Sequence, residues 1–358
     1  MKPSLRRSIS VITVGVWLAA HSASAQYTII ELPGCGADTV GVGGLSRQGN
    51  VVSACFVESG NPEFSRAILP FLINRSGSHE LPPVPGGLIV MPTGINSHGA
   101  VIANRLFPEP TRAFLIHGGD VEDLGTLGGT WSMARGINEL GHVVGAAASP
   151  HGAGHAFLYR DGVMSDLGDF GGSSSEATAI NGKGQIVINR TFGTNEAVTT
   201  AAAIYSRGLI EEITAPGKSV IGLGINSRGH VVGECLFTNE PIPEQFVPTH
   251  AFFFHDGQME DLKSLLARLT SATTTRSIND KDEIVGSWYH YFDAEEASGG
   301  FYYRNGIVVD MTDLLPADSG WSIITADYIN NTGQIVGTGY YQGNYRIYLL
   351  SPTKHNLP

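Results

Sequence analysis

One phrase of about ten residues recurs along this chain and limits its fold more than any other feature. Its copies are GLSRQGNVVS, GINSHGAVIA, GINELGHVVG, AINGKGQIVI, GINSRGHVVG, SINDKDEIVG and YINNTGQIVG. The anchor residues of the phrase are Ser46, Asn96, Asn138, Asn181, Asn226, Asn279 and Asn330, and they lie 50, 42, 43, 45, 53 and 51 residues apart. Such separations are typical of the blades of β-propellers, so the sequence predicts a repeat protein of seven units.

The phrase describes a tight turn followed by a strand. An Asn side chain can bond the nearby backbone and open a type I turn, and a Gly three residues later accepts the left-handed conformation. This Gly is present in six copies, and Asp282 replaces it in the remaining one, which we expect to be tolerated but less favourable. Two apolar β-branched residues follow in every copy, as in Val143-Val144, so the phrase predicts a hairpin.

A second hairpin completes each repeat, as in GHAFLYRDGVMSDLG. Asp161-Gly162, Asp256-Gly257 and Asn305-Gly306 are two-residue turns in which both positions favour positive φ. Each repeat is therefore predicted to hold four short strands, named here A (ending in Ile-Asn), B (Val-Val), C (Ala-Phe) and D (Asp-Leu).

The second hairpin carries a resemblance to a known family. The chain resembles the extracellular HAF-repeat proteins, named for the motif present here as His155-Ala156-Phe157 and His250-Ala251-Phe252. Degenerate copies are Arg66-Ala67-Ile68, Arg112-Ala113-Phe114 and Arg346-Ile347-Tyr348. The resemblance covers essentially the whole chain after its first 25 residues. Because that family is defined by its repeat, the resemblance implies a propeller-like architecture and export, and no activity.

Two observations predict that the repeats close into a ring. Strand A is rich in small residues, as in SEATAIN and VGVGGLS, and blades crowd toward a propeller axis. The segment 27–32 has the pattern of a strand D, whereas the last repeat ends in RIYLL, a strand C. We therefore expect an all-β, seven-bladed β-propeller with four-stranded antiparallel blades, in which the N-terminal strand completes the last blade. The alternative, an open array, would leave an unpaired edge at each end.

The first residues predict a targeting segment. Lys2, Arg6 and Arg7 precede an apolar stretch over 9–20 that is too short to span a membrane. Small residues before Gln26 indicate cleavage after Ala25. The expected division is a signal peptide over 1–25, a single propeller domain over 26–350 and a tail over 351–358, in a secreted or periplasmic monomer without a transmembrane segment.

Charge and cysteine content exclude several partners. Without the targeting segment the chain carries 19 basic and 33 acidic side chains, a net charge of −14, which would repel the phosphates of nucleic acids. Of the three cysteines, only Cys35 and Cys55 are candidates for a disulfide, because Cys235 occupies the same place as Cys55 in a distant repeat. No metal-ligand spacing occurs, so neither a metal nor a cofactor is expected.

The predicted ligand-binding face carries the B–C and D–A connections. The A–B and C–D turns are uniform, but the B–C loops differ in every repeat, and variable loops on rigid strands are typical of binding sites. Aromatic rings gather on these connections, together with two charged residues at a strand-A position near the axis. The predicted binding residues are Trp131, Trp288, Tyr291, Trp321, Tyr340, Tyr341, Arg276 and Asp327. The alternative for Trp131 and Trp321, and also for the run from Trp288 to Tyr291, is a role as lids over the blade cores.

Residues that recur with the repeat are interpreted as scaffold. The basic residue that opens strand C is expected to bond a neighbouring loop carbonyl. Arg135, Arg276 and Asp327 break the pattern at one equivalent strand-A site, where other repeats carry Thr, Gly or Leu. They are either functional or paired with each other or with water.

Three functions remain open. The first is an exported, non-enzymatic binding propeller for a glycan or peptide. The second is a polysaccharide-active enzyme, a uronic-acid glycan lyase or glycosidase, which needs a base and a group that neutralises a sugar carboxylate. Candidate bases are His290, Tyr289 and His151, and candidate neutralisers are Arg105, Arg190 and Arg135. The third is a structural component of a surface or matrix.

Overall fold

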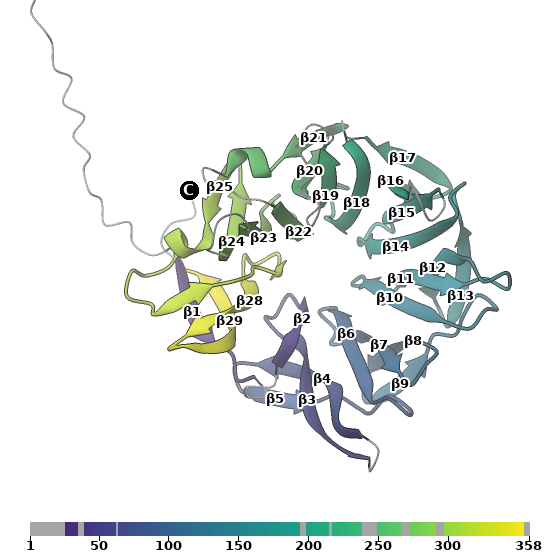
Figure 1. Cartoon of the computed structure of the whole chain (residues 1–358), viewed down its shortest axis with the longest axis horizontal. Helices are drawn as coiled ribbons and strands as arrows, with labels where there is room; N and C mark the ends of the chain where they lie inside the picture. The colour runs from purple at the N-terminus through teal and green to yellow at the C-terminus, as the bar shows by residue number, and fades with distance from the viewer. Residues whose placement is uncertain are drawn as a thin grey trace, which may run out of the picture.

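The repeats fold into small antiparallel sheets that stand radially around a central opening (Figure 1). The structure, a computed structural model, describes residues 26–34, 39–61, 64–193, 198–214, 217–237, 249–266, 272–290 and 297–353. The expected signal peptide over 1–25 lies outside these ranges. Within them, no helix has the length and apolar character needed to cross a membrane.

The strands of the first three repeats follow the A-to-D order along the chain. The first repeat contains β2 (Thr39–Leu45), β3 (Val51–Asn61), β4 (Phe64–Asn74) and β5 (Gly77–Glu80). The second contains β6 (Ile89–Ile95), β7 (Val101–Phe107), β8 (Arg112–His117) and β9 (Asp120–Asp123). The third contains β10 (Ser132–Ile137), β11 (Val143–Ala148), β12 (Gly154–Arg160) and β13 (Val163–Gly168).

The next repeats keep this order, with two 3₁₀ turns added. Strands β14 (Ser174–Ile180), β15 (Ile186–Phe192), β16 (Thr199–Ser206) and β17 (Leu209–Ile213) come first. Strands β18 (Gly217–Ile225), β19 (Val231–Phe237), β20 (His250–His255) and β21 (Gln258–Asp261) follow, with the turn η2 (Lys263–Leu265) after them. Strands β22 (Ala272–Ile278), β23 (Ile284–His290), β24 (Ala297–Arg304) and β25 (Ile307–Asp310) precede η3 (Met311–Leu314).

The last repeat takes its outer strand from the other end of the chain. It contains β26 (Trp321–Ile323), β27 (Tyr328–Ile329), β28 (Ile335–Tyr341) and β29 (Asn344–Pro352), and β1 (Tyr27–Glu31) pairs antiparallel with β29. Tyr27 and Leu32 are each 1% exposed. Arg346 forms an ion pair of 2.8 Å with Glu31. The predicted pairing of the N-terminal strand with the last strand is confirmed.

Each repeat contributes one group of strands. Hydrogen bonding within the described residues gives six sheets, because two of these groups are joined into one sheet. The eight-stranded sheet contains the β2–β5 and β6–β9 groups, and a single parallel pair, Ile68 with Ile89, connects them. The apolar core lies between neighbouring groups. In one cluster, for example, Val187 and Ile204 of β15 and β16 pack with Phe252 of β20.

The A–B turns have the predicted geometry. In the turn after β10, the Asn138 side-chain oxygen accepts hydrogen bonds from the backbone N–H groups of Leu140 and His142, at 3.0 Å each. Gly141 closes the turn at φ +80°, where a residue with a Cβ is disfavoured. The side-chain oxygen therefore fixes the turn, and the side-chain nitrogen remains available for the next repeat.

That nitrogen joins each turn to its neighbour in what we call the Asn belt. The side-chain nitrogen donates to the backbone carbonyl of the next anchor residue: Asn96 to Asn138 (3.2 Å), Asn138 to Asn181 (3.1 Å), Asn181 to Asn226 (2.8 Å), Asn226 to Asn279 (3.1 Å), Asn279 to Asn330 (3.1 Å) and Asn330 to Ser46 (2.9 Å). The recurring Asn is therefore scaffold between repeats as well as within one.

Ser46 lacks the amide that the belt uses, so the link from Ser46 to Asn96 is missing. Its hydroxyl accepts from the Asn50 backbone N–H at 3.1 Å and reproduces only the local half of the Asn geometry. We expect Ser46→Asn to add the missing bond and to stabilise the fold by about 1 kcal/mol, which raises Tm by roughly 2–4 °C. Calorimetry measures this, with Asn138→Ser as the reverse change that lowers Tm. An unchanged or lower Tm for Ser46→Asn would contradict the role given to the belt.

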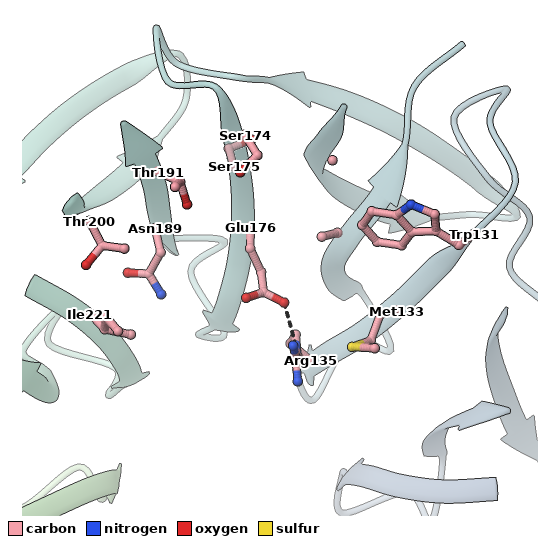
Figure 2. A pocket seen from close by; sticks show the side chains of 12 residues that line it. Trp131, Met133, Arg135, Ser174, Ser175, Glu176, Asn189, Thr191, Thr200 and Ile221 are labelled. Carbon is pink, nitrogen blue, oxygen red and sulfur yellow. Dashed lines mark hydrogen bonds and ion pairs between the residues drawn. The ribbon is translucent and has the colours of Figure 1, made fainter. Parts of the chain in front are cut away.

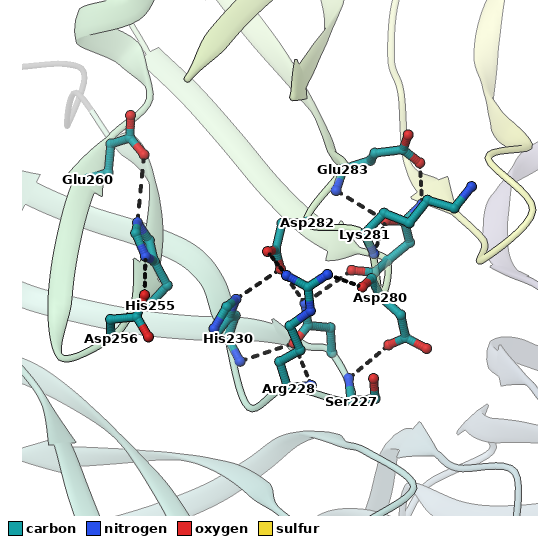
Figure 3. Close-up of polar contacts among 12 residues, drawn as sticks. Ser227, Arg228, His230, His255, Asp256, Glu260, Asp280, Lys281, Asp282 and Glu283 are labelled. Atoms are coloured by element: carbon teal, nitrogen blue, oxygen red, sulfur yellow. Dashed lines mark hydrogen bonds and ion pairs between the residues drawn. The ribbon is translucent and has the colours of Figure 1, made fainter. Parts of the chain in front are cut away.

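Asp282 is better accommodated than its sequence suggests. It adopts φ +60°, which costs free energy for a residue with a side chain. Its carboxylate, however, accepts from Asn226 Nδ2 (2.7 Å) and Arg228 Nη1 (2.5 Å) and contacts His230 Nδ1 (2.9 Å), all on the preceding turn (Figure 3). An Asp in place of the recurring Gly therefore adopts an unfavourable backbone conformation but gains polar contacts between two repeats.

The basic residue of the HAF motif has a different partner from the one expected. It pairs with the acidic residue of strand D instead of a loop carbonyl. The pairs are Arg112 with Asp123 (2.8 Å), His155 with Asp166 (3.0 Å), His250 with Asp261 (2.9 Å) and Arg346 with Glu31 (2.8 Å). The last pair shows that β1 follows the strand-D rule of the other repeats.

The first repeat also corrects the sequence interpretation of its motif. In the third repeat, Phe157 of the motif lies opposite Gly145. Ser53 holds the place of Gly145 in the first repeat, and it lies opposite Phe71. The motif position in β4 is therefore Leu69-Pro70-Phe71, and Arg66-Ala67-Ile68 precedes it by three residues. The error arose because β3 and β4 extend beyond the usual strand length, so the similar tripeptide lies on the extension. The Arg66 guanidinium lies 4.5 Å from the centre of the Phe56 ring.

The cysteines agree with the expected redox pattern as far as they are described. Cys55 is disulfide-bonded, and Cys35, its expected partner, lies outside the described residues. Cys235 is a free thiol that is 2% exposed. Burial, with a smaller effect from Asp261 and Glu234, raises the pKa of this thiol to about 12, so it is an inert core residue.

Candidate functional site

The strand-A position singled out by the sequence is a β-bulge. Strand pairing skips Arg135 between Ala134 and Gly136, and the same irregularity spans Thr178 in β14 and Arg276 in β22. A bulge leaves one residue unpaired and redirects its side chain, here on the strands nearest the central opening. Asp327 holds the equivalent place between β26 and β27. The Arg276 side chain lies outside the described set.

Arg135 lines a cavity of about 500 Å³ on the side of the variable connections, which we call the mouth cavity. Trp131 follows the D–A connection, Ser174 begins the next strand A, and Thr191 and Thr200 flank a B–C loop. The described lining residues are Trp131, Met133, Arg135, Ala146, Gly154, Ser174, Ser175, Glu176, Asn189, Thr191, Thr200 and Ile221. A mostly apolar cavity with a few converging polar groups is typical of a ligand site.

An ion pair crosses the inner side of this cavity. The Arg135 Nε lies 2.5 Å from Glu176 Oε1 and joins β10 to β14 (Figure 2). The two side chains are 42% and 31% exposed, so solvent screens the pair and its contribution to stability is small. Arg135 also lines the cavities of about 440 and 240 Å³ that continue toward the opening between the A strands. The pair therefore lies at the inner side of the mouth cavity, beside the central opening (Figure 1).

Trp131 supplies the aromatic wall of the cavity. The ring packs over Gly154, where an added Cβ would lie 3.1 Å from the indole. The residue is half-buried, and its indole N–H forms no hydrogen bond with the described residues. Trp131 therefore covers part of the β12 backbone, as the lid alternative expects, and also presents a ring face and a donor to the cavity.

Trp288 is a core residue, as the alternative to a binding role expects. It is 7% exposed, and its indole N–H donates to Asp310 Oδ2 at 3.2 Å. Gly299 lies opposite Trp288 and occupies the motif position of His155. The indole fills the space above Gly299 and bonds the strand-D carboxylate in place of the missing basic residue.

Arg190 compensates for the same loss in another repeat. In the fourth repeat, Ala201 occupies the position that the basic residue His155 holds in the third, and Arg190 lies opposite Ala201. The guanidinium reaches the strand-D residue Glu212, and Arg190 is 9% exposed. Arg190 is therefore a scaffold cation, which corrects its candidacy as a neutraliser of sugar carboxylates.

The expected catalytic set does not assemble around these arginines. Arg105 donates to the carbonyls of Pro85 (3.0 Å) and Pro110 (3.5 Å). His151 is exposed on a B–C loop, and Tyr289 and His290 lie half-buried at the end of β23. Among the described residues, none of these three bases contacts Arg105, Arg135 or Arg190.

A second aromatic group lies at the end of the last repeat. The Trp321 and Tyr341 rings stack at 5.0 Å, and Tyr340, 48% exposed, meets Tyr345 edge to face at 6.1 Å. Asp327 accepts a hydrogen bond from the Thr325 hydroxyl at 2.9 Å. Tyr291 lies outside the described residues. The aromatic residues predicted to bind a ligand therefore separate into Trp131, which shares a cavity with the candidate neutraliser Arg135, and a surface cluster with Trp321.

Sequence reasoning missed Glu176, Met133 and Asn189 in the cavity wall. Two residues before the bulge, other repeats carry Met133 or Met91, whereas this repeat carries Glu176. The acidic residue was therefore a departure from the repeat that the sequence shows. Asn189 is 9% exposed. Its Oδ1 accepts a hydrogen bond from the Gly222 backbone N–H, and its Nδ2 donates to the Gly222 carbonyl, at 2.9 Å each. It therefore fixes the neighbouring blade beside the cavity.

Comparisons with known proteins show the fold. No protein-family model matches the chain, and no curated protein matches it. The β-propeller domain of the Trilobed protease from Pyrococcus furiosus is 9% identical over 92% of this chain and 98% of its own, with a TM-score of 0.54. An ulvan polysaccharide lyase is 10% identical, with coverage of 91% and 94% and a TM-score of 0.46. TolB from Acinetobacter baumannii is 9% identical, with coverage of 85% and 64% and a TM-score of 0.44. The chain is an all-β protein of the β-propeller type.

Proposed function

We propose that the molecule is a seven-bladed propeller closed by its N-terminal strand. The β2–β5 and β6–β9 groups, which a single parallel pair joins, count as two blades. The cavity of about 240 Å³ supports a central channel, because β2, β6, β10, β14, β18, β22 and β27 all line it. The Asn330 bond to Ser46 and the Glu31 pair with Arg346 join the end of the repeat array to its beginning.

The function that the geometry favours is exported, non-enzymatic binding of a saccharide in the mouth cavity. The observation that carries it is the half-exposed Trp131 ring beside the Arg135–Glu176 pair. The apolar face of a sugar stacks on an aromatic ring, and its hydroxyl groups need donors and acceptors at the edge. The cavity supplies these from Glu176, Ser174 and Thr200, and export rests on the pattern of the first 25 residues.

Binding is favoured over catalysis because the groups a lyase needs are dispersed. A general base must come within hydrogen-bonding reach of the sugar proton while a cation neutralises the carboxylate. Arg105 and Arg190 are committed to scaffold contacts, and the predicted bases do not reach Arg135. A peptide ligand is the second candidate, because ring stacking also serves peptide side chains.

The test is a saccharide panel titrated against the mature protein and against Trp131→Ala. We expect a ligand to emerge from the panel, and Trp131→Ala to weaken its binding about thirtyfold or more with little change in Tm, as for a central aromatic contact of ~2 kcal/mol. Trp321→Ala is the matched control, since Trp321 is also half-buried on this face. Binding lost only in Trp321→Ala, or a panel without any ligand, would overturn the assignment.

A further inference from the structure

Arg135 is held in position by its neighbours before any ligand arrives. Asn104 binds Ala134 at both its N–H (2.8 Å) and its carbonyl (2.9 Å), directly before the bulge. Gly136, directly after it, lies so close to Ala179 that an added Cβ would be 3.2 Å from the Ala179 Cα. The backbone on both sides of Arg135 is therefore fixed, which lowers the ordering cost of binding through this side chain.

The contact with Glu176 leaves the terminal half of the guanidinium available. A guanidinium carries five N–H donors, of which only the one on Nε is directed at Glu176. The four N–H groups on the terminal nitrogens donate to none of the described residues. This pair of nitrogens is the edge of an arginine that binds a carboxylate or sulfate through two parallel hydrogen bonds.

Three other arginines use their terminal nitrogens differently from Arg135. The terminal nitrogens of Arg105 donate to two backbone carbonyls, and a terminal nitrogen of Arg190 or Arg112 donates to the strand-D carboxylate of its own repeat. Those three side chains are used by the scaffold through their forked edges. Arg135 instead uses its Nε for the contact with Glu176, and its terminal nitrogens donate to none of the described residues.

We propose that the mouth cavity binds an anionic oligosaccharide, with a carboxylate or sulfate group held by the terminal N–H groups of Arg135 and a sugar ring stacked on Trp131. The inference deepens the proposed saccharide-binding function and depends on it. Trp131, directly before β10, and Met133 and Arg135 of β10 line the same cavity, and four residues of extended backbone place the first and last about 13 Å apart. A chain of sugars can therefore contact both ends, which a single ring cannot.

Glu176 limits which anions can bind. Its carboxylate partly neutralises Arg135 and would repel a second anion, while its free oxygen can accept from a sugar hydroxyl. The acidic chain, with a net charge of −11, disfavours polyanions at long range. The favoured ligand therefore has one anionic group at Arg135 and hydroxyl groups elsewhere in the cavity.

The experiment compares charged and uncharged forms of the same sugars by isothermal titration calorimetry with the mature protein. The probes are trisaccharides with a single uronic acid residue beside their methyl esters, and a trisaccharide with a single sulfate group beside its desulfated form. We expect at least one charged form to bind about tenfold to a hundredfold more tightly than its uncharged counterpart. The arm that shows this difference identifies carboxylate or sulfate as the anion.

Three variants test the residue roles. Arg135→Gln should remove the preference for the charged form, so that the charged and uncharged forms of one sugar bind with about equal affinity. Arg135→Lys should retain only part of the preference, because an ammonium group lacks the fork. Glu176→Gln should strengthen binding of the charged form, which a merely structural pair would not do.

The outcomes separate the inference from the function on which it rests. If uncharged sugars bind in a Trp131-dependent manner and the charged forms bind no more tightly, the inference is wrong and the saccharide-binding function stands. A preference for the charged form that persists in Arg135→Gln also overturns the inference. If no sugar of either kind binds, both fail.

Discussion

Removal of residues 26–32 is expected to destabilise the protein more than any single substitution. This segment contains β1, whose backbone pairs with β29 over five residues, and its Tyr27 and Leu32 side chains are each 1% exposed. Deletion of one large buried side chain costs about 2–5 kcal/mol, so loss of the whole strand should cost ~5 kcal/mol or more. Since domains are stable by only about 5–15 kcal/mol, the shortened chain should unfold at least about 10 °C lower, or should not fold.

The measurement is thermal unfolding of the chain from Gln26 compared with the chain from Pro33. A peptide of residues 26–32 added in trans should restore part of the lost Tm, because the vacant edge of β29 can accept it. Two point variants locate the effect: Tyr27→Ala should destabilise strongly, and the exposed Thr28→Ala should have little effect. Equal Tm values for the long and short chains would show that the last blade does not need β1.

The second large effect is expected at Trp288, and the sign of the effect of Gly299→His depends on whether Trp288 is present. Trp288→Ala removes a buried ring and the donor to Asp310, so the free energy of unfolding should fall by about 3–5 kcal/mol. Gly299→His in the natural background should also destabilise, because an added Cβ would lie 2.6 Å from the indole. In the Trp288→Ala background, Gly299→His should stabilise, because the new imidazole can bond Asp310 as His155 bonds Asp166.

Chemical denaturation of the four proteins in this cycle measures the coupling. A rescue in the double variant supports the interpretation of Trp288 as a replacement for the motif cation. If Trp288→Ala instead keeps its stability and loses saccharide binding, Trp288 is a ligand residue. Additive effects of the two substitutions would show that the indole and the motif position do not share one role.

The sequence allowed the local structure to be predicted because turns and hairpins depend on residues close in the chain. The Asn-x-x-Gly turns and the two-residue turns such as Asp161-Gly162 follow from such local patterns. The pairing of β1 with β29 joins distant residues and was predictable because each end of the chain carries part of one repeat. The equivalent position of Arg135, Arg276 and Asp327 was also visible, because the repeat supplies its own alignment. Of the site, the sequence indicated Trp131 and Arg135.

The remainder depended on strand register and on contacts between blades. Trp288 looked like an exposed aromatic because a sequence does not show which residue lies opposite Gly299. Arg190 and Ala201 are related in the same way. The motif at Arg66 was misplaced because an extended hairpin shifts the alignment by three residues. Glu176 was missed because its partner Arg135 lies in the preceding repeat, 41 residues away.

The Asn belt also has a consequence for the evolution of molecules of this kind. Each link uses one turn's amide and the next turn's carbonyl, so a duplicated or deleted repeat would leave every remaining link chemically the same. The belt thus imposes no particular blade number. That number must be decided where neighbouring A strands almost touch, at residues such as Gly43, whose missing Cβ would lie 2.2 Å from the Pro92 carbonyl oxygen. Bulkier residues there would push neighbouring A strands apart, so the angle between neighbouring blades can change through a few glycines while the turn phrase stays intact.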